Sequence, residues 1–297
     1  MATKPSSPSK PYLGNIIPVL TRIITGIIVP WAIAVRDDNH VIVTEHFDDC
    51  VAILDRKGKK VKSLGRKRGG GDFNLFNPRG VAITPDKFIL VSDDHRIQKI
   101  CMDGYLNKPL GKYGSDRQEF KYPHGIAISP ITGKVYIADC NNHRIQVWNP
   151  NLTFSHSFGS YGSANGQFQR PADIAIDSQG LVYVADCWNH RIQKFSPDGE
   201  FVGQFGTKGS DDRELETPEG IAIDTAATGL VYVSESGNHR ISVFTSDGEF
   251  VGKFGSKGSD DGQFHCPRGL AFDNDGFLYV CDSNNNRIVV YKIHVCT

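Results

Sequence analysis

Four histidines occupy one repeated position in this sequence of 297 residues, and imidazole nitrogens are common metal ligands. They are His95, His143, His190 and His239, spaced 47 to 49 residues apart. Bonds from nitrogen to a metal are about 2 Å long, so ligands contributed by separate structural repeats do not reach one ion. We therefore predict that these histidines are turn residues and that the chain uses no metal or other cofactor.

Five arginines each follow an acidic residue across a short turn. The pairs are Asp93 with Arg96, Asp139 with Arg144, Asp186 with Arg191, Glu235 with Arg240, and Asp282 with Arg287. Charge-assisted hydrogen bonds between the two groups would fix each turn, which favours a structural role over a ligand-binding ring. The first repeat keeps the acid, Glu45, but has Cys50 in place of the arginine. We expect this turn to be the weakest, unless Glu45 finds another partner.

Paired carboxylates are the other groups that could do acid–base chemistry. Asp211-Asp212 and Asp260-Asp261 lie in two loops of similar Gly, Ser and Lys composition. Their repetition is typical of solvated turns, so we predict that the chain is not an enzyme.

The elements that position these residues repeat with a period of 45 to 49 residues. Each repeat is marked by a proline, and the six are Pro30, Pro78, Pro123, Pro171, Pro218 and Pro267. Most of them open a Pro-x-Gly-hydrophobic-Ala-hydrophobic segment, in which small residues suit a crowded inner strand. A second strand such as 135–139 follows, and Asn-His-Arg-Ile begins a third. An Asp-Gly turn such as 198–199 leads into a fourth strand. Four short strands in each of six repeats predict an all-β, six-bladed β-propeller with four-stranded antiparallel blades.

The two ends of the chain indicate how the ring closes. The sixth repeat starts at Pro267 and ends after its third strand, whereas residues 13–17 align with the fourth strand at 250–254. We therefore predict that the N-terminal strand completes the last blade and removes a free sheet edge. Residues 1–10 are expected to be a disordered tail, and residues 11–297 one monomeric propeller domain. The apolar stretch 16–31 is interrupted by Pro, Arg and Gly and is shorter than the roughly 20 residues of a membrane-spanning helix, so no membrane association is expected.

The repeated motifs resemble a known family. The Asn-His-Arg-Ile core, the Pro-x-Gly-Ile-Ala opening and the Phe-x-x-x-Phe-Gly exit are similar to NHL repeats over about residues 11–294. The propeller resembles the C-terminal domain of TRIM-NHL proteins, which are RING-type ubiquitin ligases whose appended propeller binds RNA or protein partners. Their RING and B-box modules need closely paired Cys and His ligands, and this sequence has none with that spacing. The resemblance therefore implies a binding platform, with ubiquitin transfer supplied by another chain or segment.

Residues that vary between repeats are better candidates for function than those that the fold repeats. The x of Pro-x-Gly is expected to face the mouth of the channel, and around the ring it reads Trp31, Arg79, His124, Ala172, Glu219 and Arg268.

The charges are unevenly distributed along the chain, although the net charge is zero. Residues 1–80 hold 13 Lys and Arg against 7 Asp and Glu, whereas residues 198–262 hold 5 against 13, so the protein has a charge dipole. Basic side chains interleaved with aromatic rings suit single-stranded or looped RNA. We expect phosphate contacts from Arg66, Lys67, Arg68, Arg79 and Arg268, and base stacking on Trp31, Phe73 and His124.

Two other functions stay open. One is a protein-interaction or substrate-recognition module of a TRIM-type ubiquitin ligase system. The other is a six-bladed metal-dependent lactonase or lyase; such enzymes hold an axial metal with acids, Asn or His. Here Glu219 and His124 stand out near the axis, two blades apart. The seven cysteines are odd in number and include no C-x-x-C, which indicates a reducing compartment and a cytoplasmic location.

Overall fold

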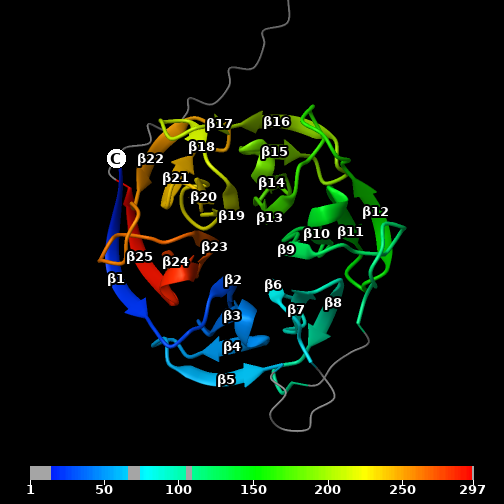
Figure 1. Cartoon of the computed structure of the whole chain (residues 1–297), viewed down its shortest axis with the longest axis horizontal. Helices are drawn as coiled ribbons and strands as arrows, with labels where there is room; N and C mark the ends of the chain where they lie inside the picture. The colour runs from blue at the N-terminus through cyan, green and yellow to red at the C-terminus, as the bar shows by residue number, and fades with distance from the viewer. Residues whose placement is uncertain (1–14, 66–73, 105–108, 296–297) are drawn as a thin grey trace, which may run out of the picture.

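The computed structural model describes residues 15–65, 74–104 and 109–295, in which six β-sheets are arranged as a ring around a central axis (Figure 1). This confirms the predicted six-bladed propeller. The predicted tail, residues 1–10, and the start of the domain at residue 11 lie outside the described residues.

Within a blade the strands run antiparallel from the axis to the rim, in chain order in blades one to five, whereas β1 is the outermost strand of blade six. Blade one contains β2 (Pro30–Val35), β3 (Val41–Glu45), β4 (Cys50–Leu54) and β5 (Lys60–Leu64). Blade two contains β6 (Pro78–Ile83), β7 (Ile89–Asp93) and β8 (Arg96–Ile100). An isolated bridge between Ile97 and Leu110 stands where its fourth strand would be. Blade three contains β9 (Pro123–Ile128), β10 (Val135–Asp139), β11 (Arg144–Trp148) and β12 (Phe154–Phe158).

The second half of the ring repeats this pattern. Blade four contains β13 (Pro171–Ile176), β14 (Val182–Asp186), β15 (Arg191–Phe195) and β16 (Phe201–Phe205). Blade five contains β19 (Pro218–Ile223), β20 (Val231–Glu235), β21 (Arg240–Phe244) and β22 (Phe250–Phe254). Blade six contains β23 (Pro267–Phe272), β24 (Phe277–Asp282), β25 (Arg287–Val295) and β1 (Ile16–Ile24). A short parallel pair, β17 (Thr207–Lys208) and β18 (Glu214–Leu215), lies in the loop between blades four and five.

The ring closes as the sequence predicts. Strand β1 pairs antiparallel with β25, from Ile16 opposite Val295 to Ile24 opposite Ile288, and Figure 1 shows the blue and red strands side by side. The Arg22 side chain donates one hydrogen bond to the Tyr279 hydroxyl of blade six and another to the Arg56 carbonyl of blade one, 2.7 Å each. The apolar N-terminal stretch is therefore an outer strand, and its arginine ties the last blade to the first.

The hydrophobic core lies between neighbouring blades and is built mainly by the second strand of each. Four tyrosines at one repeat position are almost fully buried there: Tyr136, Tyr183, Tyr232 and Tyr279. Near the channel the inner strands approach closely, since a Cβ added at Gly80 would lie 2.1 Å from the His124 carbonyl oxygen. Crowding around the axis therefore favours glycine at this position of the motif.

Candidate binding face

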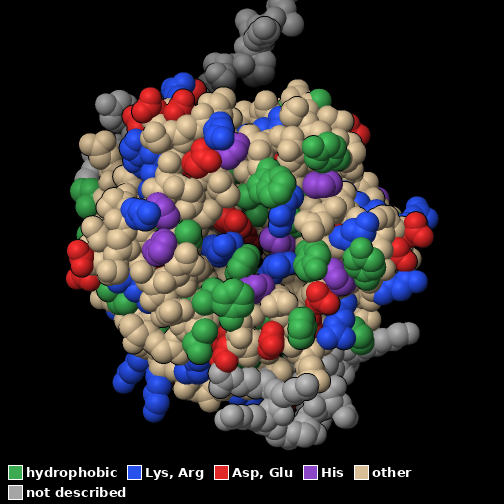
Figure 2. Space-filling model, viewed as in Figure 1, with side chains coloured by type: hydrophobic (Ala, Val, Ile, Leu, Met, Phe, Trp, Pro, Cys, Tyr) green, Lys and Arg blue, Asp and Glu red, His purple; other side chains and the backbone are tan. Residues whose placement is uncertain are grey.

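The turns that join the second and third strands all lie on the face of the ring that also carries the opening prolines, here called the mouth face. Four of them contain a short 3-10 helix: η1 (His46–Asp48), η2 (Cys140–Asn142), η3 (Cys187–Asn189) and η4 (Ser283–Asn285). Figure 2 shows hydrophobic, Lys or Arg, and His side chains gathered around the channel mouth on one face. The arrangement of these groups decides what this face can bind.

The repeated arginines are used within the fold. In blade four, Arg191 Nε donates to Asp186 Oδ2 at 2.8 Å, while its other nitrogens donate to the carbonyls of Ser163, Ala164 and Gln167 in the preceding inter-blade loop. Asp186 is fully buried. The equivalent acid–arginine pairs lie 2.7–3.2 Å apart in blades two, three, five and six. These groups fasten each loop to the next blade, so their guanidinium groups are occupied.

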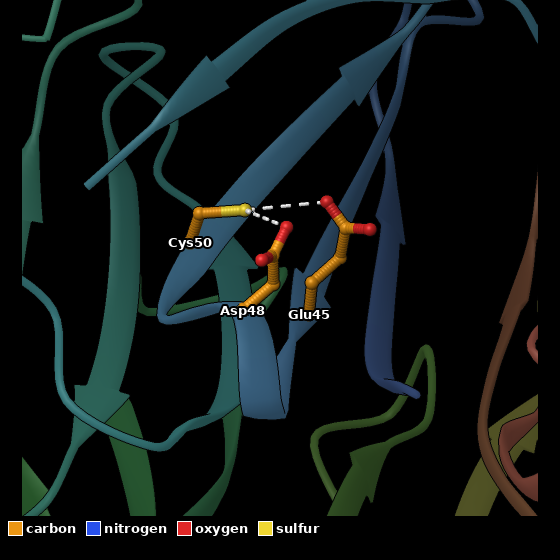
Figure 3. A group of neighbouring side chains, drawn as sticks. All are labelled: Glu45, Asp48 and Cys50. Carbon is orange, nitrogen blue, oxygen red and sulfur yellow. Dashed lines mark hydrogen bonds between the residues drawn. The ribbon is translucent and has the colours of Figure 1, made fainter. Parts of the chain in front are cut away.

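Blade one replaces this arginine with a lysine from a different strand. Lys60 Nζ, on β5, donates to both carboxylate oxygens of Glu45 at 2.9 and 2.8 Å. Figure 3 shows Cys50 and Asp48 beside the same carboxylate, and the Cys50 thiol donates to Glu45 Oε2 at 3.2 Å. Burial and the Glu45 carboxylate raise the pKa of this thiol. These three residues lie close enough to hold an ion, yet a protonated thiol and a lysine ammonium on Glu45 make this a structural turn.

The repeated histidines link neighbouring blades, a role that the sequence did not reveal. The Nδ1 atoms of His95, His143, His190 and His239, called the junction histidines, each accept a hydrogen bond from a backbone N–H of the next blade. The donors are Tyr122, Arg170, Thr217 and Cys266, at 3.1–3.2 Å. Each donor directly precedes an opening proline and has a left-handed backbone. Asn286 and Asp49 accept the same bond at the other two junctions, from Val29 and Asn77.

This geometry predicts a stability that depends on pH. Burial lowers the pKa of His143, His190 and His239 in the folded state, so that state prefers the neutral ring whose Nδ1 can accept. A histidine with a depressed folded pKa stabilises the fold above its unfolded pKa of about 6.5, and this contribution is lost as the pH falls through the folded value. We expect the melting temperature of the wild type to fall between pH 7.5 and pH 5. The fall should be a few degrees larger than that of the variant in which His143, His190 and His239 are all replaced by asparagine. Asn286 shows that asparagine can make the bond without titrating.

The triple variant H143N/H190N/H239N is also the control, because His46 and His124 remain in it and titrate as before. Differential scanning fluorimetry across this pH range measures both proteins. Parallel pH curves for the two proteins would show that the junction histidines do not carry the effect.

Trp31 is the centre of the channel mouth. The Arg268 guanidinium lies 3.7 Å from its ring centroid and that of Arg79 lies 5.5 Å away. Hydroxyl groups of the second strands position these residues, because Thr44 donates to the Arg79 carbonyl and Ser234 to the Arg268 carbonyl. The sequence-predicted cluster of Trp31, Arg79 and Arg268 therefore meets at the mouth.

Two residues of the expected site have different surroundings from those anticipated. His124 is only 6% exposed and makes an edge contact with Trp31, so its ring is not open for a base to stack on it. Glu219, which the sequence places near the axis within the acidic segment 198–262, is bonded to Arg268 at 3.2 Å. Arg66, Lys67, Arg68 and Phe73 lie outside the described residues.

Several mouth residues were missed because the repeat pattern concealed them. Asp173 occupies the place of the glycine in Pro-x-Gly and accepts a hydrogen bond from the Ile221 N–H. Its burial raises the pKa of this carboxyl to about 7. Arg170, which precedes Pro171, stacks on Trp188 with its Cζ 4.6 Å from the ring centroid. The available signal for Asp173 was an acidic residue at a motif position that otherwise holds Gly or Ala.

Exposed aromatic rings surround the mouth. Tyr113 and Tyr122 pack against His95, and Tyr161 packs against His143, with ring centroids 4.4–5.0 Å apart. Tyr161 is 67% exposed and Trp188 55%. Phe47 and Phe76 add two more exposed rings from blade one and the loop before blade two. The junction histidines thus support a broad surface of aromatic side chains.

The cavity at the axis is small. It measures about 20 Å³ and is lined by Trp31, Arg79, Asp173, Glu219 and Arg268 among others. That volume holds about one water molecule. A larger cavity of about 510 Å³ lies at the other end of the inner strands of blades one to three, beside Val35, Ile83 and Ile128. None of the residues singled out from the sequence lines this larger cavity.

Comparison with known proteins identifies the repeats. The family model described as NHL repeat matches residues 120–148, 168–195, 215–244 and 264–291. The chain is a β-propeller that contains NHL repeats, here called the NHL propeller. Each matched segment of this NHL propeller begins at a buried loop residue and ends in the third strand of a blade, so it contains the opening proline and the acid–arginine turn.

Curated relatives share part of the NHL propeller. The mouse E3 ubiquitin-protein ligase NHLRC1 is 28% identical over 137 residues, which is 41% of this chain and 31% of the relative. The human NHL repeat-containing protein 3 is 31% identical over 106 residues, which is 35% of this chain and 29% of the relative. The chain therefore matches less than a third of the length of either relative.

Solved structures share the whole architecture at low sequence identity. A gluconolactonase from Xanthomonas campestris superimposes with a TM-score of 0.70 at 14% identity, covering 99% of each chain. A virginiamycin B lyase from Staphylococcus aureus gives 0.61 at 14% identity, covering 94% of this chain and 99% of the lyase. Such likeness shows a common fold. No helix among the described parts of the NHL propeller is long and apolar enough to cross a membrane.

Proposed function

We propose that this NHL propeller is a non-enzymatic platform that binds a protein partner on its mouth face. The observation that carries the proposal is the set of exposed aromatic rings beside arginines around the channel mouth. Trp, Tyr and Arg are the residues that most often dominate the affinity of protein interfaces. The match to a part of a protein named as a ubiquitin ligase supports a role in substrate recognition within such a system.

The charges at the axis favour binding over the lactonase or lyase alternative. Arg79 and Arg268 line the axial cavity together with Glu219 and Asp173. Because Glu219 is already paired with Arg268, a cation placed there would meet two guanidinium charges. The cavity has space for about one water molecule. A substrate would therefore have to lie on the mouth face, where the aromatic rings are.

Replacing Tyr161 and Trp188 by alanine tests the platform. Both side chains are more than half exposed, so the fold should tolerate the change. Truncation of a central aromatic residue at an interface costs about 2 kcal/mol or more, which is roughly a thirty-fold loss of affinity. We expect proteins captured by the wild type, after nuclease treatment and in high salt, to be lost with Y161A/W188A in quantitative affinity proteomics.

The matched control is Val202→Ser, because Val202 is 52% exposed on β16, the outer strand of blade four. This variant should retain the captured proteins. If Y161A/W188A retains the captured proteins and V202S loses them, the interface lies at the rim and not at the mouth.

RNA binding is a second candidate, which is favoured by the cation–aromatic pairs at the mouth. Arg79 lies over Tyr122 and Arg170 over Trp188, a combination that suits phosphate contacts beside stacked bases. Filter binding of single-stranded RNA against salt concentration tests this, with charge reversal at Arg79 and Arg268. This candidate is rejected if binding is undetectable at low salt, or if R79E and R268E leave it unchanged.

A further inference from the structure

The Arg79 side chain is partly buried and has no anionic partner among the described residues. Its Nε is inaccessible to solvent and has no hydrogen-bond acceptor, and none of the described residues forms an ion pair with its guanidinium group. Burial lowers the pKa of Arg79, which records the cost of holding this charge away from water. Leaving a buried charge uncompensated is unfavourable unless a counter-ion completes the site.

Arg268 presents a second cation to the same space. It lines the axial cavity together with Arg79, and both guanidinium groups lie over the Trp31 ring. Glu219 accepts a bond from Arg268 Nη1 at 3.2 Å, while Arg268 Nε is buried and has no acceptor. One carboxylate therefore faces two arginines, and at least one positive charge at the mouth is not neutralised.

The surrounding groups do little to neutralise this positive charge. His124 is nine-tenths buried with an unpartnered Nε2, and after burial the charges of Arg79, Arg170 and Arg268 are the main causes that lower its pKa. The neutral ring can therefore donate a hydrogen bond to an anion. Because it carries no positive charge, it does not compete with the arginines for that anion. Asp173 is the other nearby acid, and its raised pKa of about 7 reduces its negative charge near neutral pH.

The shape of the site limits what the anion can be. The cavity between the arginines measures about 20 Å³, so a ligand reaches it with a small terminal group rather than entering the channel. A planar carboxylate matches the fork of N–H groups on a guanidinium, so a carboxylate is the small terminal group that suits this site best.

From these observations we infer that Arg79 and Arg268 form a socket for one carboxylate group of an acidic peptide at the centre of the mouth. The inference rests on the proposed function, because it specifies the chemistry of the protein partner that the aromatic rings would surround. Glu219 fills part of the socket when no partner is bound, and a peptide carboxylate would compete with it for Arg268.

Tryptophan fluorescence gives a direct test. In a Trp188→Phe background the remaining tryptophans are Trp31, which contacts both arginines, and Trp148, which is buried. We expect a glutamate-rich peptide to change the Trp31 emission in a saturable way and its glutamine counterpart to have no effect. R79Q should weaken binding at least about ten-fold, as expected for loss of a charged hydrogen-bond donor.

Two further variants make the test specific. E219Q should strengthen binding, because it removes the carboxylate that competes for Arg268, and a merely structural role for Glu219 would not predict this. R56Q removes the same charge at an exposed position bonded to Asp275 and should leave affinity unchanged.

The outcomes separate this inference from the proposed function. Equal binding of the glutamate and glutamine peptides, or tighter binding of an RNA oligonucleotide than of the acidic peptide, would overturn the carboxylate socket. Loss of captured proteins in Y161A/W188A would still support the platform in that case. Loss of peptide binding in R56Q as well as R79Q would show only a general effect of charge, and would also overturn the socket.

Discussion

Removing residues 1–24 is expected to lower the free energy of unfolding by about 5 kcal/mol or more, because β1 supplies the outer strand of blade six. Ile24 is fully buried in the core between blades six and one, and Ile16, Leu20 and Ile23 pack against the neighbouring cluster between blades five and six. Burying one such side chain contributes about 1.5–3 kcal/mol when burial is complete. The loss is a large part of the 5–15 kcal/mol that stabilises a typical domain. Urea unfolding followed by circular dichroism measures it.

Removal of residues 1–14 alone is the matched control, since it leaves the whole of β1 in place. A synthetic peptide of residues 15–26 should restore part of the lost stability when added to the 1–24 truncation. Identical unfolding curves for the full chain and the 1–24 truncation would show that β1 does not close the ring.

The architecture could be predicted from the sequence because each blade repeats the same local requirements. The prolines, the crowded glycines and the Asp-Gly turns recur at one period, and backbone geometry alone requires these residue types. The closing strand followed from the same repeat, once residues 13–17 were aligned with β22. The interruption by Arg22, used to reject a membrane helix, turned out to mark a contact between blades six and one.

The binding face was predicted only in part, because its residues touch across blades rather than along the chain. The repeat placed Trp31, Arg79 and Arg268 at the mouth, but it could not show that Glu219 reaches Arg268. The junction histidines were expected to be turn residues, and their hydrogen bonds to the next blade depend on the packing angle between sheets. The sequence nevertheless contained a sign of this role. Asp49 and Asn286 stand where the other blades have histidine, and all of these side chains can accept a hydrogen bond.

The turn of blade one shows how a local rule can be satisfied by another strand. Sequence reasoning offered two outcomes for Glu45, a weak turn or a different partner, and the structure contains the second. Lys60 reaches Glu45 from β5, fifteen residues away, so no pattern within the turn predicts it. What the fold requires at this position is a cation beside a buried carboxylate, rather than an arginine at a fixed place in the motif.

Replacing Asp186 by alanine is therefore expected to be among the most damaging single changes, lowering the free energy of unfolding by about 3–5 kcal/mol. The substitution leaves Arg191, which is mostly buried, without a counter-charge. It also removes the acceptor of hydrogen bonds from Asn189, Gln193 and the Gln169 backbone. Chemical denaturation of the variant and the wild type gives the difference directly.

A surface ion pair of similar length provides the comparison. Arg213 and Glu249 lie 2.6 Å apart with both side chains more than half exposed, so Glu249→Ala should change stability by about 1 kcal/mol or less. Lys60→Met should resemble Asp186→Ala instead, because Glu45 is fully buried and would lose its only cation among the described residues. If D186A and K60M cost no more than E249A, the buried turn pairs do not hold the blades together, and the loops must be fixed by their apolar residues alone.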